Sequence, residues 1–324
     1  MGMTGHVYLC KAREPLTQPR AALTAACIQV PTATGHQVLA VVKIMSKVKM
    51  LRINQVVNVT KEKNVLAAWT CPQIISSLHT FQDRSNLYLV LEFMAGGDLF
   101  QHLCDVRRLS LGPARFYACE ILLALGYIHG CDHVYRDLKP ENILMDASGH
   151  VKLADMGFCK ELKAGERTYT TCGTADYMAP EVMRCQGYNR SADYWAFGVL
   201  VYEMLTGMAP FASKSDRERH AKILSAAILY PSDFNLHAKD LVARLCVVDI
   251  SHRLGMMAAG IEEIQDHQFF ADVDWRAMSE GTIKPPFVPR VRTQADWDTR
   301  LPMFLPAEKE ETLHPEDEAA FLGY

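Results

Sequence analysis

Three oxygen-bearing side chains stand close together in the stretch HVYRDLKPENILMDASGHVKLADMG. Asn142 follows Asp137 by five residues, and Asp155 follows it by eighteen. Carboxylate and amide oxygens are the hard ligands that Mg²⁺ prefers, and a separate free carboxylate can accept a proton from a hydroxyl group. Lys139 stands two residues after Asp137 and can neutralise a migrating phosphoryl group. A solvated polar loop explains any one of these residues, but their combined spacing favours a site for phosphoryl transfer.

The rest of the sequence predicts two regions that differ in secondary structure. Up to about residue 93 lie three runs typical of strands, HVYLCKA, VLAVVKIM and LYLVLEF, with a helix predicted over residues 53–69. From Gly96 onward, apolar residues recur at three- and four-residue spacing, as in ARFYACEILLALGYIHG and SADYWAFGVLVYEMLTG. We therefore expect a small sheet with one helix, followed by a mostly helical region.

The composition is that of an ordinary globular protein, with 49% hydrophobic and 22% charged residues in a chain of 324. A net charge of -3 argues against a nucleic acid as partner. The ten cysteines include no CxxC pair, which argues against zinc sites and disulfides and favours the cytoplasm or the nucleus. We expect no membrane span, because no stretch approaches the roughly 18 apolar residues that a span needs.

The motifs YRDLKPEN, DMG and APE resemble the catalytic loop, the metal-binding loop and the end of the activation segment of eukaryotic protein kinases. The resemblance covers nearly the whole chain. It implies an α+β, two-lobed fold, with a small antiparallel-sheet lobe over residues 1–93, a large helical lobe over 94–283 and a tail over 284–324. It also implies the use of ATP and Mg²⁺ to phosphorylate protein hydroxyl groups.

Within the catalytic and metal-binding loops, the resemblance implies a role for each polar side chain. Asp137 would accept the proton of the substrate hydroxyl group, with Lys139 beside it. Asn142 and Asp155 would bind magnesium. Thr174 lies where the family has a threonine that touches Asp137 and Lys139.

The resemblance also places nucleotide-binding residues near the start of the chain. Lys43 would hold the ATP phosphates, and Glu62, nineteen residues later, would hold Lys43. The family's glycine-rich loop has the pattern GxGxxGxV, and GMTGHV matches its second half with Gly2, Gly5 and Val7. Because the first glycine is absent from this sequence, either upstream residues are missing or ATP is bound poorly. The second case would make the protein a pseudokinase, an inactive binding scaffold.

The adenine ring would meet a set of residues that the resemblance assigns to the sheet and to the hinge that follows it. Val41 stands where the family has an alanine that faces adenine, and Leu91 is the gatekeeper. Glu92 and Met94 would offer backbone groups to the ring. Between the first two predicted strands, residues 14–35 read as an inserted loop with prolines and almost no charge.

Acidic residues around the expected peptide groove predict a substrate with arginines before the phosphorylated Ser or Thr. The resemblance places Asp98, Glu141 and Glu203 there, and carboxylates pair well with guanidinium groups. It also counts Asp98 among the residues that bind the nucleotide. Structural roles remain open for each: Asp98 could cap a helix, and Glu203 could make helix contacts only.

The run TYTTCGT resembles the activation segment of the AGC group of Ser/Thr kinases. Thr170 occupies the phosphorylation site, where a phosphate could pair with Arg136. Within that group the sequence is similar to the cyclic-nucleotide-dependent kinases, types A and G, which the residues do not separate. This similarity implies a cyclic-nucleotide-binding regulatory subunit or domain as partner, with Tyr169 and His220 as candidate contacts.

The resemblance assigns structural roles to four further features. Glu181 and Arg253 would form a buried ion pair, and Asp193 would hold the backbone of the catalytic loop. The terminal FLGY resembles an aromatic tail that packs on the small lobe.

Overall fold

The computed structural model describes residues 6–11, 39–289 and 315–324. Gly2, Gly5 and the segment 14–35 lie outside the described residues. The chain divides into two compact units. The small unit comprises the described residues up to Thr70, Ile75–Ala95 and the C-terminal residues, and the large unit comprises Cys71–Ile74 and Gly96–Pro289.

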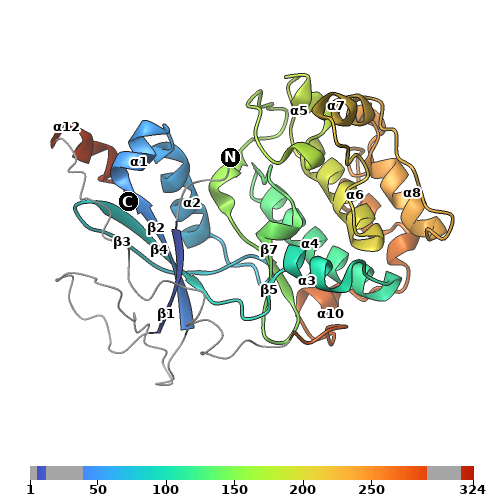
Figure 1. Cartoon of the computed structure of the whole chain (residues 1–324), viewed down its shortest axis with the longest axis horizontal. Coiled ribbons are helices and arrows are strands. Elements are labelled where there is room, and N and C mark those ends of the chain that lie inside the picture. The colour runs from blue at the N-terminus through green and yellow to red at the C-terminus, as the bar shows by residue number, and fades with distance from the viewer. Residues whose placement is uncertain (1–5, 12–38, 290–314) are drawn as a thin grey trace. The chain divides into compact units, whose positions relative to one another are not determined.

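The small unit contains a four-stranded antiparallel sheet with the order β1-β2-β4-β3 (Figure 1). The strands are β1 (His6–Lys11), β2 (Leu39–Ser46), β3 (Ser77–Gln82) and β4 (Asn86–Glu92), accompanied by the helices α1 (Lys47–Arg52) and α2 (Val56–Ala68). The sequence predicted three of these strands and α2. It missed β3, because SLHTFQ alternates polar with apolar residues weakly and the register shifts between Ser77 and His79.

The side chains of β2 point alternately to the two faces of the sheet. Ala40 and Val42 point into the core, where they meet Tyr88 and Val90 of β4. Val41 and Lys43, the positions that alternate with them, lie on the opposite face of the sheet and are only partly buried. The strand therefore presents its lysine on the face turned away from that core.

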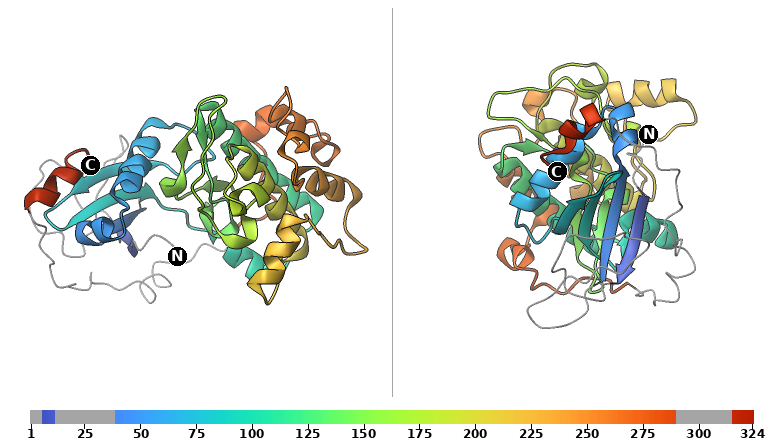
Figure 2. Two further views of the ribbon diagram at one scale, coloured as in Figure 1. Left: turned by 90° about the horizontal axis from the view of Figure 1, so that it is seen from above. Right: turned by 90° about the vertical axis from the view of Figure 1, so that its left-hand side faces the viewer.

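The C-terminal residues also belong to the small unit. Helix α12 (Pro315–Glu318) and the turn Ala319–Phe321 lie beside α1 and the β3 end of the sheet (Figure 2). Phe321 is buried, Gln82 donates a hydrogen bond to its carbonyl oxygen at 3.0 Å, and Lys47 lies 5.4 Å from its ring centroid. The expected packing of the terminal aromatic segment on the small unit is confirmed.

The large unit is mostly helical and carries two small antiparallel sheets. One contains β5 (Gly97–Asp98), β7 (Ile143–Met145) and β8 (Val151–Leu153), and the other pairs β6 (His133–Val134) with β9 (Lys160–Glu161). The helices are α3 (Leu99–Val106), α4 (Leu111–Gly130), α5 (Pro180–Met183), α6 (Ser191–Thr206), α7 (Asp216–Leu224), α8 (Leu236–Leu245), α9 (Glu262–Gln265) and α10 (Trp275–Ser279). Together the two units form the predicted α+β fold.

Helices α4 and α6 form the centre of the large unit. Both are buried over most of their length, and α4 packs against α6, α10 and β8. Helix α6 ends at Gly207, whose left-handed backbone (φ 83°) lies so close to Arg107 that a Cβ atom would sit 2.2 Å from the Arg107 carbonyl oxygen. Glycine is common at the end of a helix because it adopts the left-handed conformation without strain, and the close approach explains why a larger residue would not fit here.

Helix α4 requires one correction. It is long and apolar enough to cross a membrane by composition, contrary to the sequence-based statement that no stretch comes near this limit. In the structure, 61% of the apolar window is buried within the protein. That burial is typical of the core helix of a globular domain, which passes the same test of length and composition.

Candidate active site

The catalytic loop is held in place by a buried aspartate of α6. The carboxylate of Asp193 accepts hydrogen bonds from the backbone N–H groups of Tyr135 (2.9 Å) and Arg136 (2.8 Å), and it lies 2.8 Å from Nε2 of His129. Arg136 has a positive φ of 73°, so the loop turns sharply there. This arrangement confirms the expected role of Asp193 and places the next residue, Asp137, at the turn.

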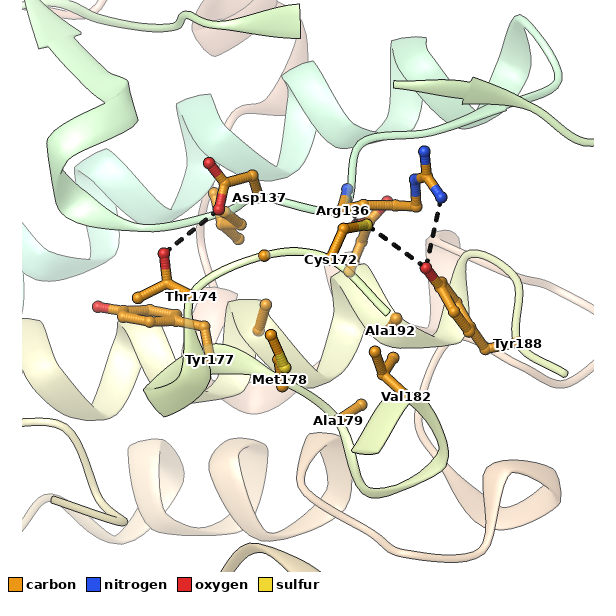
Figure 3. Close-up of a pocket in the computed structure, with 14 residues that line it drawn as sticks. Arg136, Asp137, Cys172, Thr174, Tyr177, Met178, Ala179, Val182, Tyr188 and Ala192 are labelled. Atoms are coloured by element: carbon orange, nitrogen blue, oxygen red, sulfur yellow. Dashed lines mark hydrogen bonds between the residues drawn. The ribbon is translucent and has the colours of Figure 1, made fainter. Parts of the chain in front are cut away.

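Three polar side chains converge on the carboxylate of Asp137. Oδ2 lies 2.9 Å from Nζ of Lys139 and accepts a hydrogen bond from Nδ2 of Asn142 at 2.8 Å. Oδ1 accepts a longer bond, 3.3 Å, from the hydroxyl group of Thr174, which itself accepts from Lys139 at 3.1 Å. Asp137 is therefore fixed mainly through Oδ2, and Oδ1 is held more weakly. Figure 3 shows the hydrogen bond between Thr174 and Asp137. The expected contacts of Thr174 are confirmed.

Asn142 and Asp155 lie at the same end of the hairpin formed by β7 and β8. Asn142 directly precedes β7 and Asp155 follows β8 by two residues, while Ile143 pairs with Leu153. The N–H group of Ala154 also donates to the Asn142 carbonyl oxygen at 2.9 Å. Asp155 has a left-handed backbone (φ 55°, ψ 78°), so the chain turns immediately after the hairpin.

These two side chains are the ones expected to bind magnesium, and each carries an oxygen atom of the kind that Mg²⁺ prefers. Nδ2 of Asn142 donates to both Oδ2 and the carbonyl oxygen of Asp137, which leaves its amide oxygen as the group that can bind a metal. Within the described residues no group of three or more His, Cys, Asp and Glu side chains could hold a metal. A hard cation bound here would thus take one carboxylate, one amide oxygen and further oxygens from a ligand such as a phosphate, which is how Mg²⁺ is commonly bound.

In the small unit, Lys43 of β2 forms an ion pair with Glu62 of α2. Nζ of Lys43 lies 2.8 Å from Oε1 and 3.0 Å from Oε2 of Glu62, whose side chain is 1% exposed. A carboxylate so deeply buried is stable because it is paired with a cation. The structure therefore brings these two predicted residues together.

The other residues predicted to bind the nucleotide occupy defined places in the sheet. Val7 is the register partner of Lys43, and Val41 is the partner of Leu91. Cross-strand partners share a face of a sheet, so Val41, Lys43 and Leu91 lie on one face. Glu92 is the last residue of β4, and Met94, two residues later, is buried.

The comparisons with known proteins agree on one family. The protein kinase domain family matches residues 25–270. The chain belongs to the protein kinase family. Over 272 residues it is 40% identical to the human cAMP-dependent protein kinase catalytic subunit PRKX, covering 81% of this chain and 75% of the human protein.

Two further relatives extend this similarity to other organisms. The mouse protein of the same name is 43% identical over 82% of this chain and 74% of its own length. The cAMP-dependent protein kinase catalytic subunit of Dictyostelium discoideum is 39% identical over 78% of this chain but 39% of its own length. By homology the chain is a serine/threonine protein kinase of the AGC type.

The three acidic residues predicted for the kinase's peptide groove have different surroundings. Asp98 is the N-cap of α3, where its Oδ1 accepts the N–H of Gln101 at 2.7 Å, so its structural role is realised. Glu141 is exposed in the turn Pro140–Asn142. Glu203 of α6 accepts a short hydrogen bond from the hydroxyl group of Tyr177.

Burial and neighbouring charges act together on Glu203. Burial raises the pKa of its carboxyl group above the ordinary value, and the negative charges of Glu141 and Asp176 raise it further. The hydrogen bond from Tyr177 opposes this effect, because it stabilises the carboxylate. The carboxylates of Glu141, Asp176 and Glu203 thus interact electrostatically. A bound cation would stabilise their negative charges.

The activation segment of the kinase is joined to the catalytic loop through Tyr188. The hydroxyl group of Tyr188 donates to the carbonyl oxygen of Thr170 at 2.6 Å and accepts from Nη1 of Arg136 at 3.4 Å. Cys172 lies 3.7 Å from the same hydroxyl group. Figure 3 shows Arg136, Cys172 and Tyr188 around a cavity. The volume of this cavity is about 20 Å³, which leaves room for about one water molecule. Thr170, the expected phosphorylation site, is exposed.

A buried ion pair supports the end of the activation segment. Arg253 is completely buried, and its guanidinium group binds both carboxylate oxygens of Glu181, at 2.6 and 3.0 Å. It also donates to the carbonyl oxygens of Ser191 and Val247. The predicted pair is confirmed, and its hydrogen bonds are satisfied on both sides.

Sequence reasoning missed two groups of residues around the site. Tyr177 and Tyr188 hold Glu203 and Thr170, but a single tyrosine in a sequence gives no signal of its partner. Glu120 of α4 is 2% exposed and accepts hydrogen bonds from the Val151 N–H at 2.8 Å and from Nδ1 of His150 at 2.6 Å. A glutamate within an otherwise apolar helix was the signal that could have revealed this pair.

Proposed function

We propose that this kinase is catalytically active and transfers the γ-phosphoryl group of ATP, with Mg²⁺, to Ser or Thr in basic protein segments. The observation that carries the proposal is the convergence of Lys139, Asn142 and Thr174 on Asp137. A pseudokinase has no chemical need for this arrangement, nor for the Lys43–Glu62 pair. Both therefore favour an active enzyme.

The residues of the chain divide the work of the reaction between them. ATP supplies the phosphoryl group, and the Mg²⁺ bound with it would neutralise the negative charge of the phosphates. Asp137 accepts the proton of the substrate hydroxyl group, and Lys139 stabilises the negative charge that develops on the transferred group. Asn142 holds the carboxylate of Asp137 in position and, with Asp155, binds the metal. Lys43, fixed by Glu62, orients the phosphates.

The same proposal covers the nucleotide and peptide sites. Gly2, Gly5, Val7, Val41 and Leu91, together with the backbone of Glu92 and Met94, would surround the nucleotide. Asp98, Glu141 and Glu203 would recognise arginines before the phosphorylated residue. The repulsion between the negative charges of Glu141 and Glu203 supports this assignment, because a bound guanidinium group would offset that repulsion.

The experiment compares two peptides, Arg-Arg-x-Ser and Gly-Gly-x-Ser, as acceptors of phosphate from Mg-ATP. We expect a KM at least about 10-fold lower for the arginine peptide, and a comparable loss of that preference in Glu203→Gln. Glu262→Gln, an exposed change on α9, serves as the matched control. Equal use of both peptides by the unaltered protein would contradict a basic substrate.

We also propose regulation of the cAMP-dependent type, by a regulatory subunit that binds the cyclic nucleotide. The similar human, mouse and Dictyostelium proteins are named cAMP-dependent catalytic subunits, which supports cAMP over cGMP. Tyr169 is 66% exposed and His220 is exposed, so both are available for such a contact. Inhibition by a purified regulatory subunit of a cAMP-dependent protein kinase, relieved by cAMP, is the expected result. Unchanged activity would contradict it.

The cysteines support a proposal for the cellular location. In the described residues Cys71, Cys104, Cys119, Cys131, Cys159, Cys172, Cys185 and Cys246 are all free thiols. Free thiols persist where the environment is reducing, so we propose the cytoplasm or the nucleus. Imaging of the tagged full chain tests this proposal, and secretion of the protein would contradict it.

A further inference from the structure

A guanidinium group of the chain itself reaches the acidic cluster formed by Glu141, Asp176 and Glu203. Arg219 projects from α7, with Nη1 3.5 Å from Oδ1 of Asp176 and Nη2 paired with Asp216 on its own helix. The side chain of Arg219 is 19% exposed and that of Asp176 is 33% exposed. The contact is therefore partly shielded from water, where a charge pair is stronger than on an open surface.

Asp176 is linked to the proposed peptide-binding carboxylates in two ways. It directly precedes Tyr177, whose hydroxyl group donates to Glu203. Its negative charge also contributes, with that of Glu141, to the raised pKa of Glu203. Any cation bound to Asp176 therefore changes the charge that the cluster offers to a substrate.

The pair between Arg219 and Asp176 is loose. Its 3.5 Å separation exceeds the length of a normal hydrogen bond. In the described part of the chain, neither Nε of Arg219 nor Oδ1 of Asp176, both shielded from solvent, has a hydrogen-bond partner. A guanidinium group from another molecule could satisfy Asp176 better than Arg219 does, so the pair can be exchanged at low cost.

We propose that Arg219 is a specificity-determining residue that occupies Asp176 in place of a substrate arginine. The kinase then recognises basic substrates mainly through Glu141 and Glu203. An additional substrate arginine must compete with Arg219 for the carboxylate of Asp176. This inference rests on the proposed function, since it concerns the same peptide groove. It predicts that removal of Arg219 opens a further site for a guanidinium group.

The experiment measures KM for Arg-Arg-x-Ser and for a series of peptides with a third arginine placed one to five residues further upstream. In Arg219→Ala, the ratio of the two KM values should shift about 5- to 20-fold in favour of at least one three-arginine peptide, as expected for a new charge-assisted contact. Arg219→Lys, which retains the charge, should keep the original ratio. Arg217→Ala, an exposed change on the same helix, is the matched control.

A second variant separates a direct effect from a general change in the helix. In the double variant Arg219→Ala with Asp176→Asn, the gain should disappear, because the newly available carboxylate is gone. An unchanged KM ratio in Arg219→Ala, or a gain that persists in the double variant, would overturn the inference. Failure of the unaltered protein to prefer arginine peptides would instead overturn the proposed function, so the two failures are distinguishable.

Discussion

Lys43 and Glu62, nineteen residues apart in the sequence, form a bidentate contact in which Nζ lies 2.8 and 3.0 Å from the two carboxylate oxygens. The carboxylate is buried almost completely, whereas the lysine side chain is 11% exposed. The pair joins the second strand of the sheet to α2. It therefore serves both the stability of the small unit and the position of the ammonium group.

Lys43→Met should separate these two roles. We expect the loss of nearly all phosphoryl transfer and a destabilisation of about 3–5 kcal/mol, because a buried carboxylate loses its cation. The double variant with Glu62→Gln should regain much of the stability without regaining activity, as measured by thermal unfolding and peptide phosphorylation. Lys61→Met, an exposed change on α2, is the control. Full activity in Lys43→Met would contradict the assigned role.

Arg253→Ala should destabilise the large unit strongly. The substitution leaves the 2%-exposed Glu181 carboxylate without its bidentate partner, and breaking such a buried pair typically costs about 3–5 kcal/mol. Chemical denaturation of both proteins provides the measurement. A change below about 1 kcal/mol would show that water or another cation replaces the arginine.

The pair between His150 and Glu120 should make stability depend on pH. Its hydrogen bond to Glu120 raises the pKa of His150 above the ordinary value of 6.5. A raised histidine pKa contributes stability that is fully present below pH 6.5 and is lost as the pH rises through the folded-state pKa. Burial raises the pKa of Glu120 as well, and this shift also lowers stability as the pH rises.

We therefore expect the difference in melting temperature between the unaltered protein and His150→Gln to be larger at pH 6 than at pH 8.5. His237→Gln, at an exposed position on α8, should show no such trend. A difference that grows with pH would contradict the pairing.

Phe321→Ala should destabilise the small unit, because the ring is 1% exposed and packs beneath Lys47. Loss of a buried phenylalanine commonly costs about 3–5 kcal/mol. Leu322→Ala, the adjacent residue at 83% exposure, should have little effect on the melting temperature. Similar melting temperatures for the two variants would contradict the docking of the terminal segment.

The sequence predicted best those parts of the structure that are formed by residues close together in the chain. The helix expected over 53–69 is α2, although the chain first forms α1, which begins where Ser46 accepts the N–H of Lys49 at 3.4 Å. The close grouping of Asp137, Lys139 and Asn142 was predictable because six consecutive residues of one loop contain all three. Their roles in catalysis stay a prediction.

The parts that sequence could not predict depend on partners that are distant in the chain. Tyr177 meets Glu203 across 26 residues, and Glu120 meets His150 across 30, because α4 and α6 pack against the loops of the large unit. No periodicity or spacing encodes such contacts. The same limit hid Arg219, whose exposed helix reads as an ordinary charged surface until the fold brings it to Asp176.

The transfer of labelled γ-phosphate from Mg-ATP to an Arg-Arg-x-Ser peptide, by the unaltered protein and by Asp137→Asn, tests the central claim most directly. The account predicts turnover on the order of 1–100 per second for the unaltered protein and a loss of at least about 100-fold in the variant. Asp105→Asn, an exposed change on α3, should retain full activity. No transfer by the unaltered protein, or equal transfer by Asp137→Asn, would contradict the claim that this chain is an active kinase with Asp137 as its base.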